Sequence, residues 1–166
     1  MARQLWLLRH ADAEPHGTRL DAERRLTERG EEQARAAGAA LARMQAGFDS
    51  VLFSPKVRAR QTAELAAGEW GAKERAKLEE HEPLSAGFSA GEALDVLAGV
   101  PADGRVLIVG HEPDLSNVLA ALTGVNADLK KGGLAIVRLD GAAGELLLLM
   151  RPRELALVAG VPLGRN

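Results

Sequence analysis

The sequence predicts an α/β protein: a three-layer α/β/α sandwich with a mainly parallel sheet and a C-terminal antiparallel hairpin at its edge. Short, continuous apolar runs at residues 5–8, 51–53 and 105–109 are typical of strands buried in a parallel sheet. Segments with helical spacing of apolar residues separate these runs. Two further apolar runs, 134–139 and 145–150, flank a Gly-containing turn and predict the hairpin. The length of 166 residues fits a single domain spanning residues 1–166.

The first half of the chain is predicted to alternate strands with two long helices. The polar segment 11–26 is expected to be a loop. Thr27 is suited to cap a helix that runs to about Gln45, because acidic residues occupy its first turn. After the second strand, Ser54-Pro55 predicts an N-cap with Pro at the first helical position, in a helix that ends near Gly68.

The second half is predicted to contain shorter elements before its main strand. A weak strand is expected at 76–78, a loop at 79–88 and a short helix at 92–98. Pro113 is expected to open a helix directly after the strand 105–109. A last short helix is expected after Pro152.

Composition excludes several classes of protein. The chain has no Cys, which excludes disulfides, thiolate metal sites and cysteine nucleophiles. The net charge is −2 and aromatic residues are only 3%, so a general nucleic-acid binder is not expected. No apolar run is long enough to span a bilayer, and we expect a cytoplasmic protein that needs no membrane partner.

Four residues with phosphate-binding chemistry follow the predicted parallel strands. Arg9 and His10 end the first strand, Arg58 lies shortly after the second, and His111 follows the third. Ligands of parallel sheets bind at the carboxyl ends of the strands, so these residues are expected to meet at one edge.

Each of the four also has an ordinary interpretation. Arg9 and His10 can form a surface pair, and Arg58 can be a solvated helix residue. His111 can be a helix cap or a buried histidine bonded to the backbone. The placement of all four at one edge is what favours a site.

Two guanidinium groups and two helix N-termini would bind the oxygens of a phosphoryl group. Imidazole is a good nucleophile near neutral pH, and a second histidine can donate a hydrogen bond to the transferred group. Phosphoryl transfer depends mainly on positioning and electrostatic stabilisation, so Arg and His can fill the role that a metal ion fills elsewhere.

Three segments resemble the histidine phosphatase superfamily, and within it the short SixA-type phosphohistidine phosphatases of the phosphoglycerate mutase-like fold. The order of these segments, their strand context and the chain length all match. The matching segments are Leu7-Leu8-Arg9-His10-Ala11-Asp12-Ala13, Ser54-Pro55-Lys56-Val57-Arg58-Ala59-Arg60-Gln61-Thr62-Ala63 and Val109-Gly110-His111-Glu112-Pro113.

The resemblance implies roles for the four residues. His10 corresponds to the phosphorylated nucleophile, Arg9 and Arg58 to the phosphate clamp, and His111 to the second histidine of the pocket. No metal or organic cofactor is implied.

Two positions depart from the wider superfamily. Ala11 follows the catalytic histidine where most members have Gly, and SixA-like members tolerate Ala there. Larger members carry a Glu general acid between the second Arg and the second His. Glu82 is the nearest counterpart of this acid. It can act as a general acid, or it can be a solvated loop carboxylate.

Other charged residues near these motifs receive weaker assignments. Asp12 and Glu14 follow the proposed nucleophile and can adjust phosphate affinity or orient a substrate cation. His16 is expected to be a surface loop residue. Lys130 and Lys131 are expected to form a solvated turn.

The sequence therefore predicts a metal-independent phosphatase. The leading substrate is a phosphohistidine on a carrier or phosphorelay protein, because the chain lacks the long insertions with which larger relatives enclose substrates. The alternatives are a small-molecule phosphomonoesterase or mutase of the same superfamily, and a non-catalytic phosphate-binding module. We expect a monomer.

Overall fold

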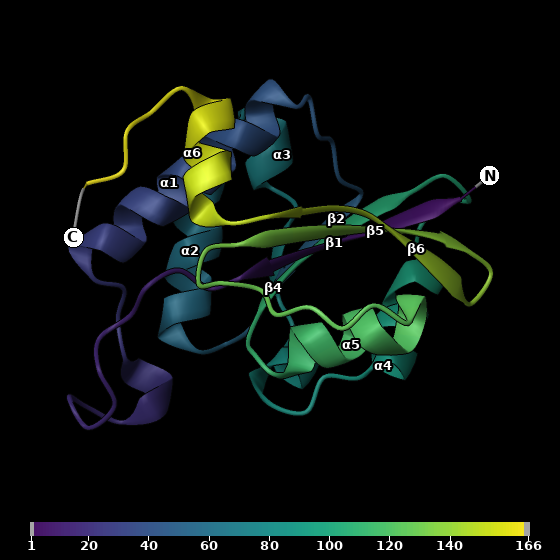
Figure 1. Ribbon diagram of the computed structural model, residues 1–166, viewed down its shortest axis with the longest axis horizontal. Helices are drawn as coiled ribbons and strands as arrows, with labels where there is room; N and C mark the ends of the chain where they lie inside the picture. The colour runs from purple at the N-terminus through teal and green to yellow at the C-terminus, as the bar shows by residue number, and fades with distance from the viewer. Residues whose placement is uncertain (1, 165–166) are drawn as a thin grey trace.

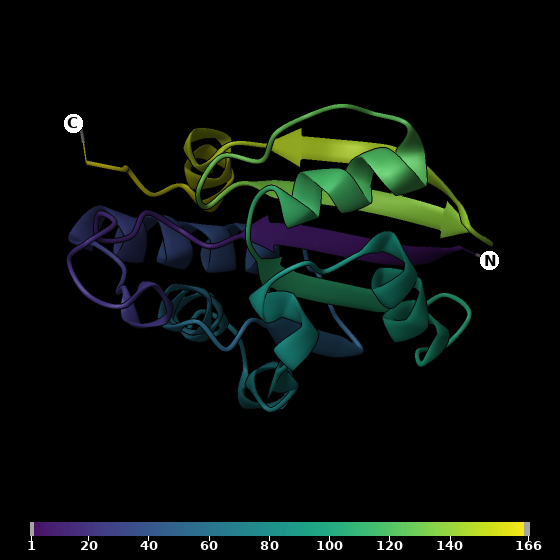
Figure 2. The ribbon, with the colours of Figure 1, turned by 90° about the horizontal axis from the view of Figure 1, so that it is seen from below.

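Six strands form one sheet in the computed structural model, which describes residues 2–164. Their order across the sheet is β3-β2-β4-β1-β5-β6. Neighbours from β3 to β1 are parallel, whereas β5 and β6 are antiparallel additions beside β1 (Figure 2). The strands are β1 Arg3–Arg9, β2 Ser50–Phe53, β3 Leu78–Glu80, β4 Arg105–Gly110, β5 Leu134–Asp140 and β6 Ala143–Met150. The predicted parallel sheet with a C-terminal hairpin at its edge is confirmed.

Helices cover both faces of the sheet (Figure 1). One face carries α1, α2, α3 and α6, and the opposite face carries α4 and α5. Two short 3-10 helices, η1 and η2, lie in the connections. The bounds are η1 Asp21–Glu23, α1 Glu28–Arg43, α2 Val57–Ala67, α3 Ala72–Arg75, η2 Glu82–Ser85, α4 Ala90–Ala98, α5 Asp114–Thr123 and α6 Pro152–Ala159.

The core is divided by the sheet because the side chains of a strand alternate between its two faces. In β1, Leu5 and Leu7 pack with the α4 and α5 residues, whereas Trp6 and Leu8 pack with α1, α2 and α6. All four are buried. The continuous apolar run therefore reflects a strand covered on both sides, as the sequence predicted.

Several local predictions were wrong. The α2 helix begins at Val57 with Lys56 in the capping position, two residues later than the Ser54 cap predicted. The strand expected at 76–78 lies at Leu78–Glu80. The helices η1, α3 and η2 were missed, because each is only three or four residues long. Elements this short carry too little apolar periodicity to be predicted.

The start of α1 is hydrogen-bonded to the segment that follows β1. The Thr27 hydroxyl oxygen accepts a hydrogen bond from Gly30 N, so the predicted cap is confirmed. The same hydroxyl donates to the Asp12 carboxylate at 2.7 Å. Gly30 is required here because a Cβ at this position would lie 1.9 Å from the Asp12 carbonyl oxygen.

No helix among residues 2–164 has the length and apolar character needed to cross a membrane.

We predict that Gly30→Ala destabilises the protein by about 1–3 kcal/mol, the usual cost of overpacking a tight contact. The added methyl group must displace the backbone at Asp12, which is not the end of a flexible side chain. Urea denaturation measures the loss. Gly91→Ala, in the first turn of α4, is the control, since its nearest neighbour would be 3.7 Å away. It is expected to be neutral or stabilising. Equal stability of the two variants would contradict the tight contact.

Candidate active site

The carboxyl ends of three parallel strands lie within one residue of one another. Arg9 pairs with Gly110 across β1 and β4, and Phe53 pairs with Val109 across β2 and β4. The residues that follow, His10, Ser54 and His111, therefore leave the sheet side by side. Backbone hydrogen bonds continue the register, from His10 N to Gly110 O and from Ser54 N to Val109 O.

A cavity of about 190 Å³ lies at this edge. All four residues singled out at the strand ends line it, so the structure brings them together. The lining consists of Arg9, His10, Ala13, Glu14, Pro15, His16, Arg24, Arg58, His111, Glu112 and Lys131.

His10 is held as a neutral imidazole with one nitrogen already occupied. Its Nδ1 lies 2.8 Å from the Ala11 carbonyl oxygen, so Nδ1–H donates to that carbonyl. The side chain is 6% exposed, and burial lowers the pKa of His10 to about 3, with Arg58 and Arg9 contributing. The Nε2 nitrogen therefore keeps its lone pair at neutral pH, which is the state a nucleophile needs.

Thr62 connects His10 to the helix that carries Arg58. The Ala11 amide donates to Thr62 Oγ1 at 3.0 Å, and the same hydroxyl donates to the Arg58 carbonyl at 2.7 Å. Thr62 is fully buried. A displacement of α2 would therefore also move the backbone that orients the His10 ring.

His111 lies beside His10, with ring centroids 5.3 Å apart. Its Nε2 is 2.7 Å from Ser54 Oγ, and Ser54 Oγ also accepts a hydrogen bond from Lys56 N. If the hydroxyl hydrogen is to have an acceptor here, it must point to His111 Nε2. This arrangement places the imidazole hydrogen of neutral His111 on Nδ1. Burial, followed by the proximity of His10 and Arg58, lowers the pKa of His111 to about 3.

The two arginines are anchored at their tips and have free Nε donors. Arg9 donates from Nη1 to the Leu129 carbonyl, and Arg58 donates from Nη1 to the Asp21 carbonyl at 2.7 Å. Within residues 2–164, Arg9 Nε, Arg58 Nε and His111 Nδ1 are buried and have no hydrogen-bond partner. Buried donors normally find acceptors, so three unpaired donors around one cavity indicate a site for an oxyanion.

Asp21 balances the positive charge on one side of the cavity. Its carboxylate contacts Arg58, Lys56 and Arg24 at 3.1–3.3 Å. Partial burial would raise the pKa of Asp21, but Arg58 and the hydrogen bonds from its basic neighbours hold that pKa well below its usual range. Burial lowers the pKa of Arg9 and Arg58, yet guanidinium groups stay charged at neutral pH.

Several residues of this site were not predicted from the sequence. Asp21 and Arg24 lie in the long segment after β1, where no periodicity predicts which side chains turn inward. Glu112 belongs to the segment that contains His111 but was not predicted to be a site residue, although it lines the cavity. Lys131 was expected in a solvated turn. It is exposed, but it lines the cavity and pairs with Asp12 at 3.5 Å.

Glu82 is the one predicted site residue that does not line the cavity. It begins η2, is exposed, and its Oε1 accepts a hydrogen bond from Ser85 Oγ. Among residues 2–164, no three His, Asp or Glu side chains are grouped so that they could hold a metal ion.

Comparison with known proteins identifies the class to which this fold and site belong. The family model described as the histidine phosphatase superfamily (branch 1) matches residues 5–85. A protein of Picosynechococcus sp. (strain ATCC 27264 / PCC 7002 / PR-6), named only as uncharacterized, is 34% identical over 170 residues, covering 92% of this chain and 98% of the relative.

Solved structures of several phosphatases share this fold. The protein histidine phosphatase SixA complexed with tungstate has a TM-score of 0.80 at 26% identity, covering 92% of this chain and 99% of the other. A SixA structure from Nakamurella multipartitia has a TM-score of 0.75 at 30% identity, with 92% and 97% coverage. The alpha-ribazole phosphatase from Shigella flexneri shares the fold, with a TM-score of 0.70, 21% identity, and 90% and 96% coverage. The chain belongs to the histidine phosphatase superfamily.

The lowered pKa values of the two histidines predict a stability that falls in mild acid. Each histidine has a pKa of about 3 when folded and 6.5 as its ordinary value, so the unfolded chain binds more protons between these limits. Stability is therefore lost as pH falls below 6.5, by about 2 kcal/mol per histidine at pH 5.

Urea denaturation at pH 7 and pH 5, in buffer without phosphate, measures this loss. His111→Asn should remove the contribution of one histidine. The difference between the unfolding free energies at pH 7 and pH 5 should therefore be about 2 kcal/mol smaller in this variant than in the wild type. Asp21, with its lowered pKa, keeps its contribution at pH 5. An identical pH dependence in wild type and variant would contradict burial of neutral His111.

The contact between Ser54 and His111 predicts a positioning role for Ser54. Ser54→Ala removes a hydrogen bond worth about 1–1.5 kcal/mol, so kcat should fall roughly tenfold while the Kd for inorganic phosphate changes little. Steady-state kinetics and phosphate titration measure the two. Ser116→Ala is the control, because its hydroxyl donates to the Pro113 carbonyl at the start of α5 and Ser116 does not line the cavity. Unchanged kcat in Ser54→Ala would remove Ser54 from this role.

Proposed function

We propose that this protein hydrolyses phosphohistidine on another protein, through a phosphorylated intermediate on His10. The observation that carries the proposal is the state of His10, whose Nδ1–H is bound to the Ala11 carbonyl while Nε2 is left unprotonated beside three unpaired donors. A phosphate-binding module without catalysis has no need of a neutral imidazole held in one tautomer.

In the first step, His10 Nε2 attacks phosphorus as the bond from phosphorus to the substrate imidazole breaks. Arg9 and Arg58 bind the oxygens of the transferred group. His111 donates a hydrogen bond from Nδ1 to this group as charge shifts during the transfer. The His10 ring then carries both its original Nδ1–H and the phosphoryl group, so it is cationic. The Ala11 carbonyl stabilises this cation through the hydrogen bond that is already present.

In the second step, water attacks phosphorus and the bond to His10 Nε2 breaks. The electron pair of that bond returns to Nε2, and the proton of the water passes to the released phosphate. His10 regains its neutral state with the hydrogen still on Nδ1, so the enzyme is ready for another turnover. No proton needs to enter or leave the His10 ring in either step.

The leaving group explains why phosphohistidine fits this site. A phosphohistidine protonated on its second ring nitrogen leaves as neutral imidazole and needs no general acid, whereas an alkoxide must be protonated. Glu82, the acid suggested by the resemblance, is exposed and outside the cavity lining. The cavity of about 190 Å³ is also below the size usual for an enclosed small ligand, so most of the substrate would remain outside it.

One observation favours a second candidate, hydrolysis of a small phosphomonoester. Glu112 lines the cavity, and its carboxyl group, when protonated, can donate a proton to an alkoxide leaving group. Its Oε1 already accepts a hydrogen bond from Ser116 N at 2.8 Å. Turnover of a phosphohistidine protein, an acyl phosphate and phosphomonoesters, measured with chelator present, separates the two candidates.

A rapid-quench experiment with ³²P-labelled phosphohistidine substrate tests the proposed intermediate. We expect acid-labile, base-stable label on the peptide that contains His10. His10→Ala should abolish both label and turnover, because the unprotonated Nε2 of the neighbouring His111 is occupied by the Ser54 hydroxyl and is not free to attack. His111→Ala should slow turnover and leave the label on His10.

Two outcomes of this experiment, and one outcome of the turnover measurements, would count against the proposal. Label on the peptide that contains His111 would reverse the roles of the two histidines. Full turnover by His10→Ala would exclude a nucleophilic role for His10. Turnover of phosphomonoesters alone, with label on His10, would favour the second candidate.

A further inference from the structure

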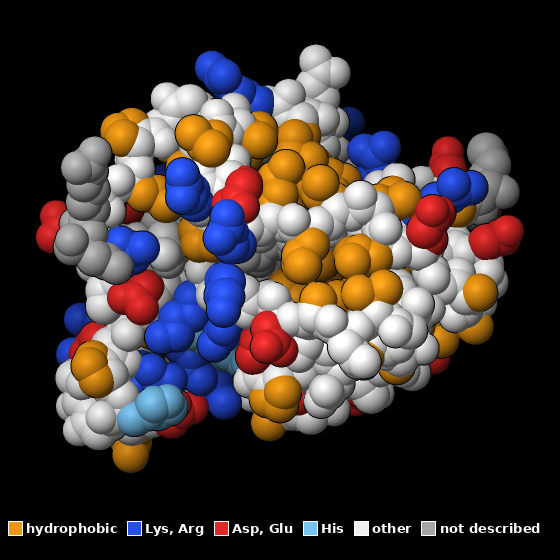
Figure 3. Space-filling model, in the orientation of Figure 1, with side chains coloured by type: hydrophobic (Ala, Val, Ile, Leu, Met, Phe, Trp, Pro, Cys, Tyr) orange, Lys and Arg blue, Asp and Glu red, His pale blue; other side chains and the backbone are white. Residues whose placement is uncertain are grey.

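A second, larger groove continues from the phosphate cavity along the molecular surface. Its volume is about 450 Å³, and Arg9 and Lys131 line both spaces. We name it the basic groove and define it by its lining: Arg9, Asp12, Arg29, Gln33, Lys130, Lys131, Arg151, Pro152, Arg153 and Leu163. Figure 3 shows a continuous band of Lys and Arg side chains on this face.

The charge of the basic groove is unlike that of the whole chain. Six of its lining residues are Lys or Arg and one, Asp12, is acidic, whereas the chain as a whole has a net charge of −2. Two of the cations have acidic partners, Lys131 with Asp12 and Arg151 with Glu154. Lys130 and Arg153 are exposed, and no ion pair within residues 2–164 neutralises either of them.

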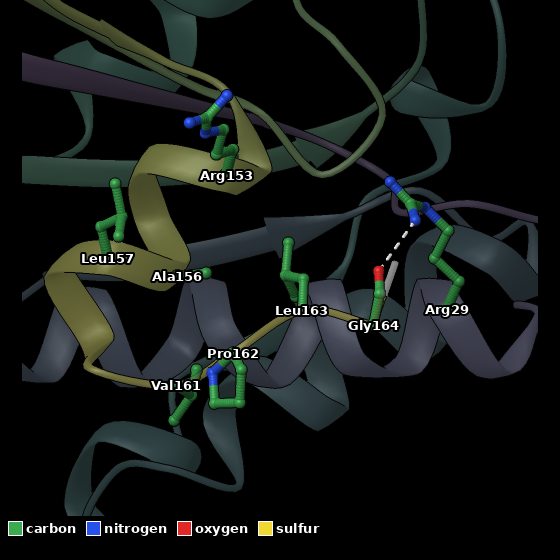
Figure 4. A pocket seen from close by; sticks show the side chains of 8 residues that line it. All are labelled: Arg29, Arg153, Ala156, Leu157, Val161, Pro162, Leu163 and Gly164. Atoms are coloured by element: carbon green, nitrogen blue, oxygen red, sulfur yellow. Dashed lines mark hydrogen bonds between the residues drawn. The ribbon is translucent and has the colours of Figure 1, made fainter. Parts of the chain in front are cut away.

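The cations of the groove come from separate elements. Arg29 lies on α1, Lys130 precedes β5, and Arg153 lies in the first turn of α6. Figure 4 shows a second cavity that adjoins the basic groove. Arg29 of α1, Arg153 of α6 and Leu163 line both spaces. Positive charge spread along a groove is suited to several separate carboxylates, whereas a compact anion requires donors that converge.

We propose that the basic groove binds an acidic segment of the phosphorylated protein while its phosphohistidine occupies the cavity. This inference rests on the proposed function and adds a feature of the substrate: Asp and Glu side chains near the phosphohistidine. Steering of an acidic surface by a basic groove raises association rates, by roughly ten- to a thousandfold at low ionic strength.

A protein segment fits the groove better than a nucleic acid does. Binding of single-stranded nucleic acid relies on aromatic side chains that stack on the bases. No Phe, Tyr or Trp lines the groove, and the whole chain has only three Phe, two Trp and no Tyr. Pro152 and Leu163 instead offer aliphatic contacts that suit the stems of amino-acid side chains.

Two synthetic peptides provide the test. Each carries one phosphohistidine, flanked by several Glu residues in one peptide and by Gln at the same positions in the other. We expect kcat/KM to be roughly tenfold higher for the Glu peptide at low ionic strength. The preference should shrink as salt rises above about 0.1 M, where the Debye length is about 10 Å.

Charge reversal locates the effect. The double variant Lys130→Glu/Arg153→Glu should lose the preference and keep the wild-type kcat/KM on the Gln peptide. The matched control, Lys73→Glu/Arg75→Glu, makes the same change of charge on α3, outside the groove lining, and should keep the preference. Equal turnover of both peptides by the wild type, or a preference retained by the Lys130→Glu/Arg153→Glu variant, would overturn the proposal.

A binding measurement keeps this inference separate from the proposed function. If neither peptide is hydrolysed, the proposed function fails, and fluorescence anisotropy with a labelled, unphosphorylated Glu peptide still tests the groove. Weaker binding by the double variant than by the wild type and the control supports the groove, and equal binding overturns it. Tighter binding of a single-stranded oligonucleotide of equal charge, lost in the double variant, would also overturn the proposal, in favour of a nucleic-acid ligand.

Discussion

The site depends on the register of three parallel strands. Because Arg9 lies opposite Gly110 and Phe53 opposite Val109, the first residues beyond β1 and β4 lie opposite each other, and the first residue beyond β2 lies one position before them. His10, Ser54 and His111 occupy those positions. A shift of one residue in either pairing would turn one of these side chains to the other face of the sheet. The buried apolar residues on both faces of β1 fix that register, so the core of the protein also determines the spacing of its two histidines.

Burial of this cluster has an electrostatic cost that shapes its chemistry. Burial, reinforced by the charge of Arg58, lowers the pKa of His10 and of His111, so both histidines are neutral when the site is free. Asp21 compensates Arg58 from the loop side, where the segment after β1 closes over the strand ends. A phosphoryl group would supply the remaining negative charge and the acceptors for three unpaired donors. The same imbalance that destabilises the free site therefore favours the bound anion.

The sequence predicted the fold and the four strand-end residues because these depend on local patterns. Buried strands have continuous apolar runs, and the carboxyl ends of parallel strands lie at one edge, so His10 and His111 could be placed without tertiary information. Arg24 and Lys131, which line the cavity, and Asp21, which pairs with Arg58, could not be placed in this way. They lie in connections whose path depends on single contacts, such as the one between Gly30 and the Asp12 carbonyl. Glu82 was predicted only as the nearest counterpart of the family's general acid or as a solvated loop carboxylate. In the structure it begins η2 and lies outside the cavity lining.

The tautomer of His10 is the most direct test of this account. Two-dimensional ¹H–¹⁵N spectra of the imidazole side chains, recorded on the phosphate-free protein from pH 7 to pH 4.5, report which ring nitrogen carries hydrogen. We predict that His10 stays neutral across this range, with hydrogen on Nδ1 and a free lone pair on Nε2, as the bond to the Ala11 carbonyl requires. A His10 ring that carries its hydrogen on Nε2, or that is already an imidazolium at pH 7, would contradict the nucleophile proposed here.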